Sequence, residues 1–178
     1  MNETGRSTED LTARQQALEE GNLASHEEGL LREGKTQLVG FKLKDQLFAV
    51  NIHDVLEIKS LPQITDVFNT PPFVSGVVNI RGDIYAVFDI GQFFDLSRTE
   101  LTDEKKLIVL QHEGQEAGIL ADRMAGVRWI DEEDIQSPPP TVAGVSSEWI
   151  EGVVQENEDP LIILDIPSIF RSERIAEL

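Results

Sequence analysis

The sequence of 178 residues contains no cysteine, which excludes disulfide bonds, thiol nucleophiles and zinc sites built on thiolates. Basic residues are scarce: 15 Lys and Arg face 33 Asp and Glu, a formal net charge of −18. An acidic surface repels phosphate backbones and anionic lipids, so nucleic acids are not expected partners. No apolar run approaches the roughly 20 residues that span a bilayer, and the acidic N-terminus lacks the apolar core of a secretory signal. We therefore expect a cytoplasmic protein without direct membrane insertion.

The first 36 residues differ from the rest of the chain, because they hold eight acidic residues and no aromatic residue. Ser7 followed by Asp10 resembles a capping box, and Leu11 and Leu18 are spaced as on one helix face. One short helix with two leucines buries too little apolar surface to be stable alone. Residues 1–36 are therefore expected to form an acidic flexible tail with a transient helix, with a docked helix as the alternative.

From Gln37 onward, short apolar segments alternate with turn residues, a pattern typical of β-hairpins. Such hairpins are predicted over residues 41–52, 77–88, 107–120 and 153–164. Helical pattern is confined to short pieces at 90–96 and 168–178, and Pro167 suits the first helical position of the second piece.

The hairpins belong to an internal repeat. A shift of 76 positions lays Gly76 on Gly152 and Asp89 on Asp165, and a shift of 69 lays Gln46 on Gln115. The body of the chain, residues 37–172, therefore consists of two repeat units at about 37–100 and 105–170. Residues 173–178 form a C-terminal helical end.

Each repeat unit is too small to leave its sheet open, since an open sheet of four or five short strands has two bare edges and little core. Closing each unit into a small barrel removes the edges, and pairing the barrels pools their cores. The sequence therefore predicts an all-β fold of two small antiparallel β-barrels packed together, with short helices.

Residues 29–36 match the phosphate-binding pattern G-x-x-x-x-G-K-[ST], with Lys35 at the lysine position. That motif requires a strand before it and a helix after it, so that backbone amides meet the phosphates. Here the preceding residues are polar and acidic, and the following residues 38–43 read as a strand. We interpret the match as a coincidence.

Other catalytic patterns are weak. His26, His53 and His112 lack metal-ligand spacing, and the acidic run 131–134 lacks the spacing of a calcium loop, so surface histidines and a solvated loop are expected. Asp89 and Asp165 recur in both units at positions where a strand ends and a helix starts, which favours a helix-start role. No metal or cofactor is predicted. A nucleotide-binding enzyme using Lys35, Asp89 and Asp165 is kept as a remote alternative.

Arg81 is the residue that breaks the repeat. It stands at a predicted turn tip of a strongly acidic chain, and its counterpart in the second unit is Asn157. Arginine is enriched at the energetic centres of protein interfaces. Arg81 is therefore a candidate for contact with a partner, with an ordinary solvated turn arginine as the alternative.

The run Gly76-Val77-Val78-Asn79-Ile80-Arg81-Gly82, followed by an apolar strand and Asp89, closely resembles the signature of the CheW-like family. The stretch from Phe48 to Ile58 is also similar to that family, and the resemblance covers about residues 37–172. It implies two SH3-like β-barrel subdomains and an adaptor, not an enzyme, without a cofactor. Members couple the cytoplasmic tips of chemoreceptors, in clusters at the membrane, to the regulatory domain of a CheA-type histidine kinase in a two-component system.

The resemblance also implies functional residues. The critical arginine of the family falls on Arg81 and its acidic partner on Glu57, while Gly76 and Val55 match positions that line the receptor groove. Gly76 is expected to let a partner helix approach, so that Gly76→Arg abolishes receptor coupling without unfolding the chain. The candidate receptor- and kinase-binding residues are Val55, Glu57, Gly76, Val77, Asn79, Arg81 and Gly82. Kinase contacts are expected at exposed apolar residues of both units.

Two departures from the family pattern leave the pathway open. The acidic tail is additional, and the acidic residues 156–159 stand at the turn of the last hairpin, where they can alter partner choice. Residues 80–85 also resemble members that serve pilus-based or gliding motility. An adaptor of such a pathway, or a competing adaptor that keeps the kinase from receptors, is the alternative function.

Overall fold

The computed structural model describes residues 33–97, 101–102, 104–156 and 159–176. The chain divides into two compact units, Met1–Lys35 and Thr36–Leu178, and the elements reported below belong to the second unit apart from the first residue of the first strand. The predicted tail up to residue 32, together with His26, lies outside the described residues. None of the described helices has the length and apolar character needed to cross a bilayer.

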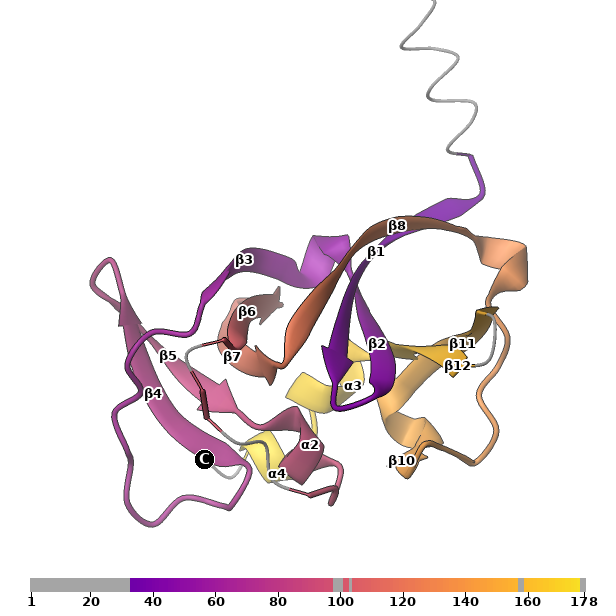
Figure 1. The fold of residues 1–178 in the computed structure, drawn as a ribbon. Coiled ribbons are helices and arrows are strands. Elements are labelled where there is room, and N and C mark those ends of the chain that lie inside the picture. The colour runs from indigo at the N-terminus through magenta and orange to yellow at the C-terminus, as the bar shows by residue number, and fades with distance from the viewer. Residues whose placement is uncertain (1–32, 98–100, 103, 157–158, 177–178) are drawn as a thin grey trace, which may run out of the picture. The chain divides into compact units, whose positions relative to one another are not determined.

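Strands make up most of the described secondary structure (Figure 1). The strands are β1 (Lys35–Leu43), β2 (Gln46–Asn51), β3 (Val55–Ser60), β4 (Val74–Ile80), β5 (Asp83–Phe88), β6 (Lys106–His112), β7 (Gln115–Ala121), β8 (Arg123–Asp131), β9 (Thr141–Val142), β10 (Val145–Ser146), β11 (Ile150–Glu156) and β12 (Asp159–Leu164). The short helices are α2 (Ile90–Phe93), α3 (Ile166–Phe170) and α4 (Glu173–Ala176), and the 3-10 helices are η1 (Ile52–Asp54), η2 (Glu132–Asp134) and η3 (Ser147–Trp149).

In the described part of the chain, the strands form two five-stranded sheets and a small β9–β10 ribbon. One sheet has the order β11-β12-β2-β1-β8 and the other the order β3-β6-β7-β5-β4. The four predicted hairpins are present as β1–β2, β4–β5, β6–β7 and β11–β12. These predictions and the predicted fold class of two small β-barrels with short helices are confirmed.

The two repeat units exchange their first hairpins. β1 and β2, indigo in Figure 1, join β8, β11 and β12 of the second unit, while β6 and β7 join β3, β4 and β5 of the first unit. At each junction the pairing is parallel, with Phe48 beside Ile162 and Val87 beside Gly118. The expectation that each unit closes its own barrel with antiparallel pairing throughout is therefore wrong. No hairpin turn joins β2 to β12 or β5 to β7, so local chain geometry does not impose antiparallel pairing there.

Each sheet is closed by the chain that leaves one edge strand and returns to the other. After β3, Thr65 exchanges two backbone hydrogen bonds with Val77 of β4, at 2.8 and 2.9 Å. After β8, Gln136 likewise exchanges two backbone hydrogen bonds with Val153 of β11, both at 2.9 Å. We call these places the β3–β4 seam and the β8–β11 seam. They pair backbone groups of edge strands, which limits association of those edges with other chains.

Three groups of buried side chains hold the described unit together. The shared core between the sheets contains 23 buried residues, among them Phe41, Phe48, Phe93, Ile108 and Ile162. The interior of the β11-β12-β2-β1-β8 sheet consists of Leu38, Leu47, Ala49, Val154, Leu161 and Ile163. The interior of the β3-β6-β7-β5-β4 sheet consists of Val78, Ile80, Val87, Leu107, Val109 and Leu120.

The central strands supply both an interior and the shared core. In β12, Leu161 and Ile163 face the interior while Ile162 and Leu164 face the shared core. Successive side chains of a strand point to opposite faces, so a strand that is buried on both faces becomes a continuous apolar run. This explains why the sequence of β12 is apolar throughout residues 161–164 instead of alternating with polar residues.

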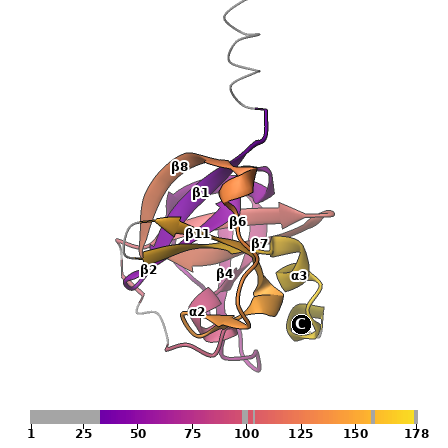
Figure 2. The same cartoon turned by 90° about the vertical axis from the view of Figure 1, so that its right-hand side faces the viewer.

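The helices follow the last strand of each repeat unit. Asp89 accepts a hydrogen bond from the backbone of Gln92 at 3.2 Å, and Asp165 accepts one from Ser168 at 2.9 Å. The predicted helix-start role of both aspartates is confirmed, because an N-cap carboxylate satisfies an otherwise unpaired backbone donor. Pro167 lies in the first turn of α3. In Figures 1 and 2, α2 lies on the side of the sheets away from β8.

We predict that Val87→Asp unfolds the protein. Val87 is fully buried in a six-residue interior, and an unpaired carboxylate there costs several kcal/mol, roughly 3 or more. The matched control is Ile84→Asp on the same strand, because Ile84 is 70% exposed. Urea unfolding followed by circular dichroism is the measurement, and equal midpoints for the two variants would contradict the assigned interior.

Candidate functional site

The hairpin between β4 and β5 ends in a two-residue turn formed by Arg81 and Gly82. Both residues have positive φ, 56° and 103°, as in the tight turn that matches the twist of antiparallel strands. The side-chain oxygen of Asn79 accepts a hydrogen bond from the backbone of Gly82 at 3.0 Å. Asn79 and Gly82 therefore set the conformation that projects Arg81 from the end of the hairpin.

Arg81 forms an ion pair with Glu57 of β3. Its Nη2 lies 3.3 Å from Oε1 of Glu57, and the Nζ of Lys59 lies 3.6 Å from the same oxygen. The Arg81 side chain is 82% exposed, whereas that of Glu57 is 29% exposed. An ion pair this exposed stabilises the fold by only about 0–1 kcal/mol. The Glu57 carboxylate therefore mainly orients the Arg81 guanidinium and contributes little to stability. Most of the guanidinium remains accessible.

The surroundings of Arg81 are acidic. Burial raises the pKa of Tyr85 above its usual range, and the nearby carboxylates of Glu116, Asp83 and Glu57 raise it further. These carboxylates disfavour a second negative charge on the phenol. Arg81 is thus an exposed cation beside a negative region, and a partner needs an acceptor placed at the guanidinium itself.

A second ion pair lies at the equivalent place in the other barrel. Arg81 and Glu57 connect the β4–β5 turn to β3, on either side of the β3–β4 seam. Arg128 of β8 and Glu156 at the end of β11 form an ion pair across the β8–β11 seam. The charges are reversed, since the edge strand carries the acid in the first case and the base in the second. The sequence prediction missed Arg128 and Glu156, because neither aligns with Glu57 or Arg81 under the repeat shifts.

The expectation that Gly76→Arg obstructs a surface and leaves the fold intact is wrong. Gly76 is buried, has φ +135°, and a Cβ atom added there would lie 2.3 Å from the carbonyl oxygen of Thr65 and 2.6 Å from a methyl group of Ile64. Gly152, its repeat counterpart, would place a Cβ atom 2.3 Å from Ile135. The space above Gly76 is already filled by the chain of the seam, so Gly76→Arg is expected to disturb the fold and not merely to obstruct a surface.

The seven predicted site residues fall into separate places. Glu57, Asn79, Arg81 and Gly82 gather at the end of the β4–β5 hairpin. Gly76 and Val77 lie at the β3–β4 seam, where the backbone of Val77 bonds to Thr65. Val55 is the first residue of β3 and packs against the shared core. The structure therefore brings four of the seven together.

The described chain also carries exposed apolar side chains on both barrels, and the sequence prediction did not name them. On β3 and β5 they are Leu56 (45% exposed), Ile58 (40%) and Ile84 (70%). In the loop after β3, Phe68 is 89% exposed and Val67 is 42% exposed. On β8 of the other barrel, Val127 and Trp129 are 54% and 42% exposed. A polar loop that contains an isolated phenylalanine, such as residues 65–70, was the available sequence signal.

The residues of the remote enzymatic alternative are spread over the fold. Lys35 opens β1, so a strand follows the phosphate-binding-like pattern as predicted, while residues 29–32 of that pattern lie outside the described residues. Asp89 and Asp165 cap helices. The acidic run 131–134, expected as a loop, forms the end of β8 and helix η2. Asp89 and Asp165 therefore have structural roles at two different helix starts.

Comparison with known proteins gives consistent matches. The family model of the CheW-like domain matches residues 37–174. The chemotaxis protein CheW of Treponema pallidum is 32% identical over 146 residues, covering 80% of this chain and 86% of the relative. The chemotaxis protein CheW of Rhizobium meliloti is 28% identical over 152 residues, covering 85% of this chain and 96% of the relative. The crystal structure of the scaffolding protein TtCheW from Thermoanaerobacter tengcongensis superposes with a TM-score of 0.70 at 29% identity, covering 78% of this chain and 90% of that chain.

We predict that Gly76→Ala destabilises the fold more than Gly82→Ala. Both substitutions force an L-residue into positive φ at a cost of about 1–3 kcal/mol. Gly82 has open space around its Cα, whereas Gly76 faces the Thr65 carbonyl, so Gly76→Ala adds an overpacking cost of about 1–3 kcal/mol. Denaturant unfolding measures both. Equal losses of stability would show that the seam yields without cost.

Proposed function

The chain belongs to the CheW-like family, and from that membership we propose that it is a non-enzymatic signalling adaptor that couples chemoreceptors to a CheA-type histidine kinase. In this proposal the chain acts only through protein–protein contacts and catalyses no reaction. The observation that carries it is Arg81, an exposed guanidinium held at a hairpin end by a half-buried glutamate. Its resemblance to the critical arginine of the family and its accessibility point to the same role.

The receptor tip is proposed to contact the end of the β4–β5 hairpin. A guanidinium carries five N–H donors, and the ion pair with Glu57 uses Nη2. The remaining donors face solvent and suit carbonyl or carboxylate acceptors of a partner. Asn79 and Gly82 contribute by fixing the turn. Val55 is assigned to the edge of the same surface, because it begins the strand that carries Glu57.

Gly76 and Val77 are proposed to act indirectly. Their contacts are with Ile64 and Thr65 of the same chain. The β3–β4 seam holds the strand that leads into the Arg81 turn against the chain that follows the Glu57 strand. We therefore assign Gly76 and Val77, together with Asn79 and Gly82, to positioning the site, and Val55, Glu57 and Arg81 to the surface that the partner contacts.

The kinase is proposed to bind exposed apolar residues of both barrels. In the first repeat unit these are Val67 and Phe68, and in the second they are Val127 and Trp129. An aromatic side chain that is almost fully exposed gains favourable burial when a partner covers it. The regulatory domain of the kinase is expected to supply an apolar surface of its own. Binding to receptor and kinase recruits this cytoplasmic adaptor to membrane receptor clusters.

We predict that Arg81→Ala weakens binding to a chemoreceptor tip by about 30-fold or more, as truncation of an interface arginine costs about 2 kcal/mol. Thermal stability should change little because the ion pair is exposed. Titration calorimetry with a purified receptor-tip fragment measures the affinity. Arg171→Ala is the control, since Arg171 is 61% exposed and also paired with a glutamate. Unchanged receptor affinity of Arg81→Ala would contradict the proposed receptor contact.

We predict that Phe68→Ser weakens binding to the isolated CheA-type regulatory domain by at least about tenfold and leaves receptor binding unchanged. Phe68 is 89% exposed, so the fold loses little while the interface loses an aromatic anchor. Co-purification and titration with the regulatory domain are the measurements. Asp66→Ser in the same exposed loop is the control. If Phe68→Ser binds the kinase domain like the unmodified chain, the loop is not part of the kinase surface.

A further inference from the structure

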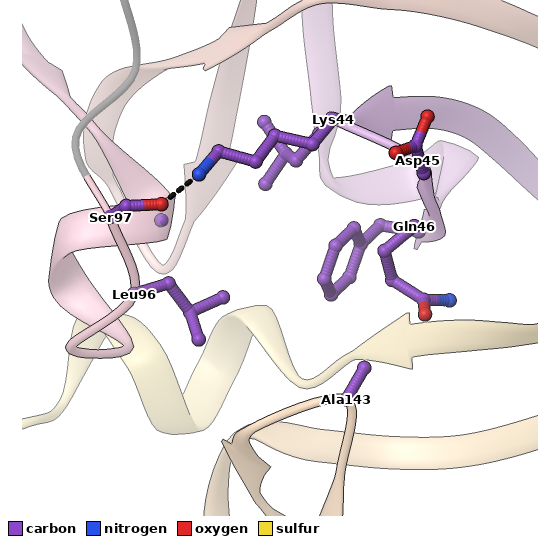
Figure 3. Close-up of a pocket in the computed structure, with 9 residues that line it drawn as sticks. Lys44, Asp45, Gln46, Leu96, Ser97 and Ala143 are labelled. Atoms are coloured by element: carbon purple, nitrogen blue, oxygen red, sulfur yellow. Dashed lines mark hydrogen bonds between the residues drawn. The ribbon is translucent and has the colours of Figure 1, made fainter.

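A cavity of about 280 Å³ lies apart from the Arg81 site, between the β1–β2 turn, the end of α2 and the β9–β10 turn. Leu43 and Phe48, both buried, form apolar walls, and Leu96 and Ala143 complete them. Figure 3 shows Lys44, Gln46, Leu96 and Ala143 around one space, with Lys44 reaching across it. An apolar cavity with a few polar groups at its rim is typical of a binding site.

Lys44 places its ammonium at this rim. Its Nζ donates a hydrogen bond to the hydroxyl of Ser97, and within the described part of the chain this ammonium is bonded to no carboxylate. The chain has 33 acidic and 15 basic residues, so most cations have acids available. Asp45, the other charged residue of the rim, points away from Leu96 and Ala143 in Figure 3.

The internal repeat indicates what Lys44 lacks. The shift of 69 lays Lys44 on Glu113, and the shift of 76 lays Asp95 on Arg171. In the second repeat unit, Glu113 and Arg171 form an ion pair at 3.7 Å. In the first unit, Asp95 pairs with Arg174 of α4 at 2.8 Å. The carboxylate equivalent to Arg171 is therefore already engaged, and among the described residues the acceptor of the Lys44 ammonium is the neutral hydroxyl of Ser97.

We propose that this cavity binds a peptide segment of a partner protein that inserts one apolar side chain and presents a carboxylate to Lys44. The walls formed by Leu43, Phe48 and Leu96 suit a side chain of leucine size. The carboxylate replaces the Ser97 hydroxyl as the acceptor of the ammonium, which gives a charge-assisted hydrogen bond in place of a neutral one. The cavity shares no residue with Glu57 or Arg81, so this surface is independent of the proposed adaptor contacts.

The test uses N-acetyl-leucine as the probe, because it combines a branched apolar side chain with a carboxylate. N-acetyl-leucinamide lacks the charge, and N-acetylalanine lacks the anchor. Backbone-amide NMR spectra of the full chain are recorded with each probe up to about 10 mM, since a molecule this small binds with millimolar affinity. N-acetyl-leucine should shift the signals of Lys44, Gly91, Leu96 and Ser97, with the two other probes about tenfold weaker.

Variants separate the cavity from the general surface. Lys44→Met keeps the aliphatic stem and should lower the affinity for N-acetyl-leucine about tenfold, as expected for loss of a hydrogen bond to a charged group. Lys42→Met, on strand β1 just before the turn that carries Lys44, is the control and should bind normally. Ser97→Trp at the rim should fill the cavity and abolish binding of the probe.

Three results would overturn the proposal. Equal shifts with N-acetyl-leucinamide would remove the role of the carboxylate, and equal shifts with N-acetylalanine would remove the role of the anchor. Absence of shifts at the cavity residues would remove the site. Arg81→Ala should bind the probe like the unmodified chain, so a failure of the adaptor proposal remains distinguishable from a failure of this one.

Discussion

Packing of two sheets against one shared core is the interaction on which this structure depends. Each barrel interior has six buried residues, whereas the shared core has 23. Because apolar burial scales with the area removed from water, neither interior approaches the contribution of the core between the sheets. The exchanged hairpins strengthen this dependence. A sheet cannot form completely until both repeat units are present, so the two barrels are expected to fold as one cooperative unit.

The same constraint links the seams to the candidate site. A five-stranded sheet with a small interior must be closed, and each closure brings the seam close to a glycine. A Cβ atom at Gly76 would meet the carbonyl oxygen of Thr65, and one at Gly152 would meet a side-chain methyl group of Ile135. The run from Gly76 to Gly82 therefore serves two purposes. Its first residues close the barrel, and its last residues project Arg81 beside Glu57. The residues that resemble a recognition motif are in part residues that make the fold possible.

Period-two patterns and the repeat shift were sufficient to predict the hairpins and the helix starts at Asp89 and Asp165. The pairing of Arg81 with Glu57 was predicted by the family resemblance alone. The patterns and the shift were insufficient for the hairpin exchange, because Phe48 and Ile162 would be buried whichever sheet received β2. The role of Gly76 was also inaccessible, since the atoms that crowd it belong to Ile64 and Thr65, whose return to β4 depends on closure of the sheet. The exposure of Phe68 was indicated only by its place in a polar loop, because the extent of exposure is set by tertiary packing.

The repeat is most informative where its symmetry fails. Duplication yields two barrels with equivalent seams, helix caps and turns, yet the charges at the seams and at the turns have diverged. At the seams, the edge strand carries the acid Glu57, paired with Arg81, in one barrel and the base Arg128, paired with Glu156, in the other. At the turns, Lys44 of the first repeat unit corresponds to Glu113 of the second. Packing alone does not require such reversals, because these side chains are at least partly exposed and such ion pairs contribute little to stability. Opposite charges on equivalent surfaces do favour different partners. A duplicated scaffold with reversed charges is therefore suited to bind two unlike proteins at once. A scaffold with the same charges on both barrels would not distinguish the two proteins.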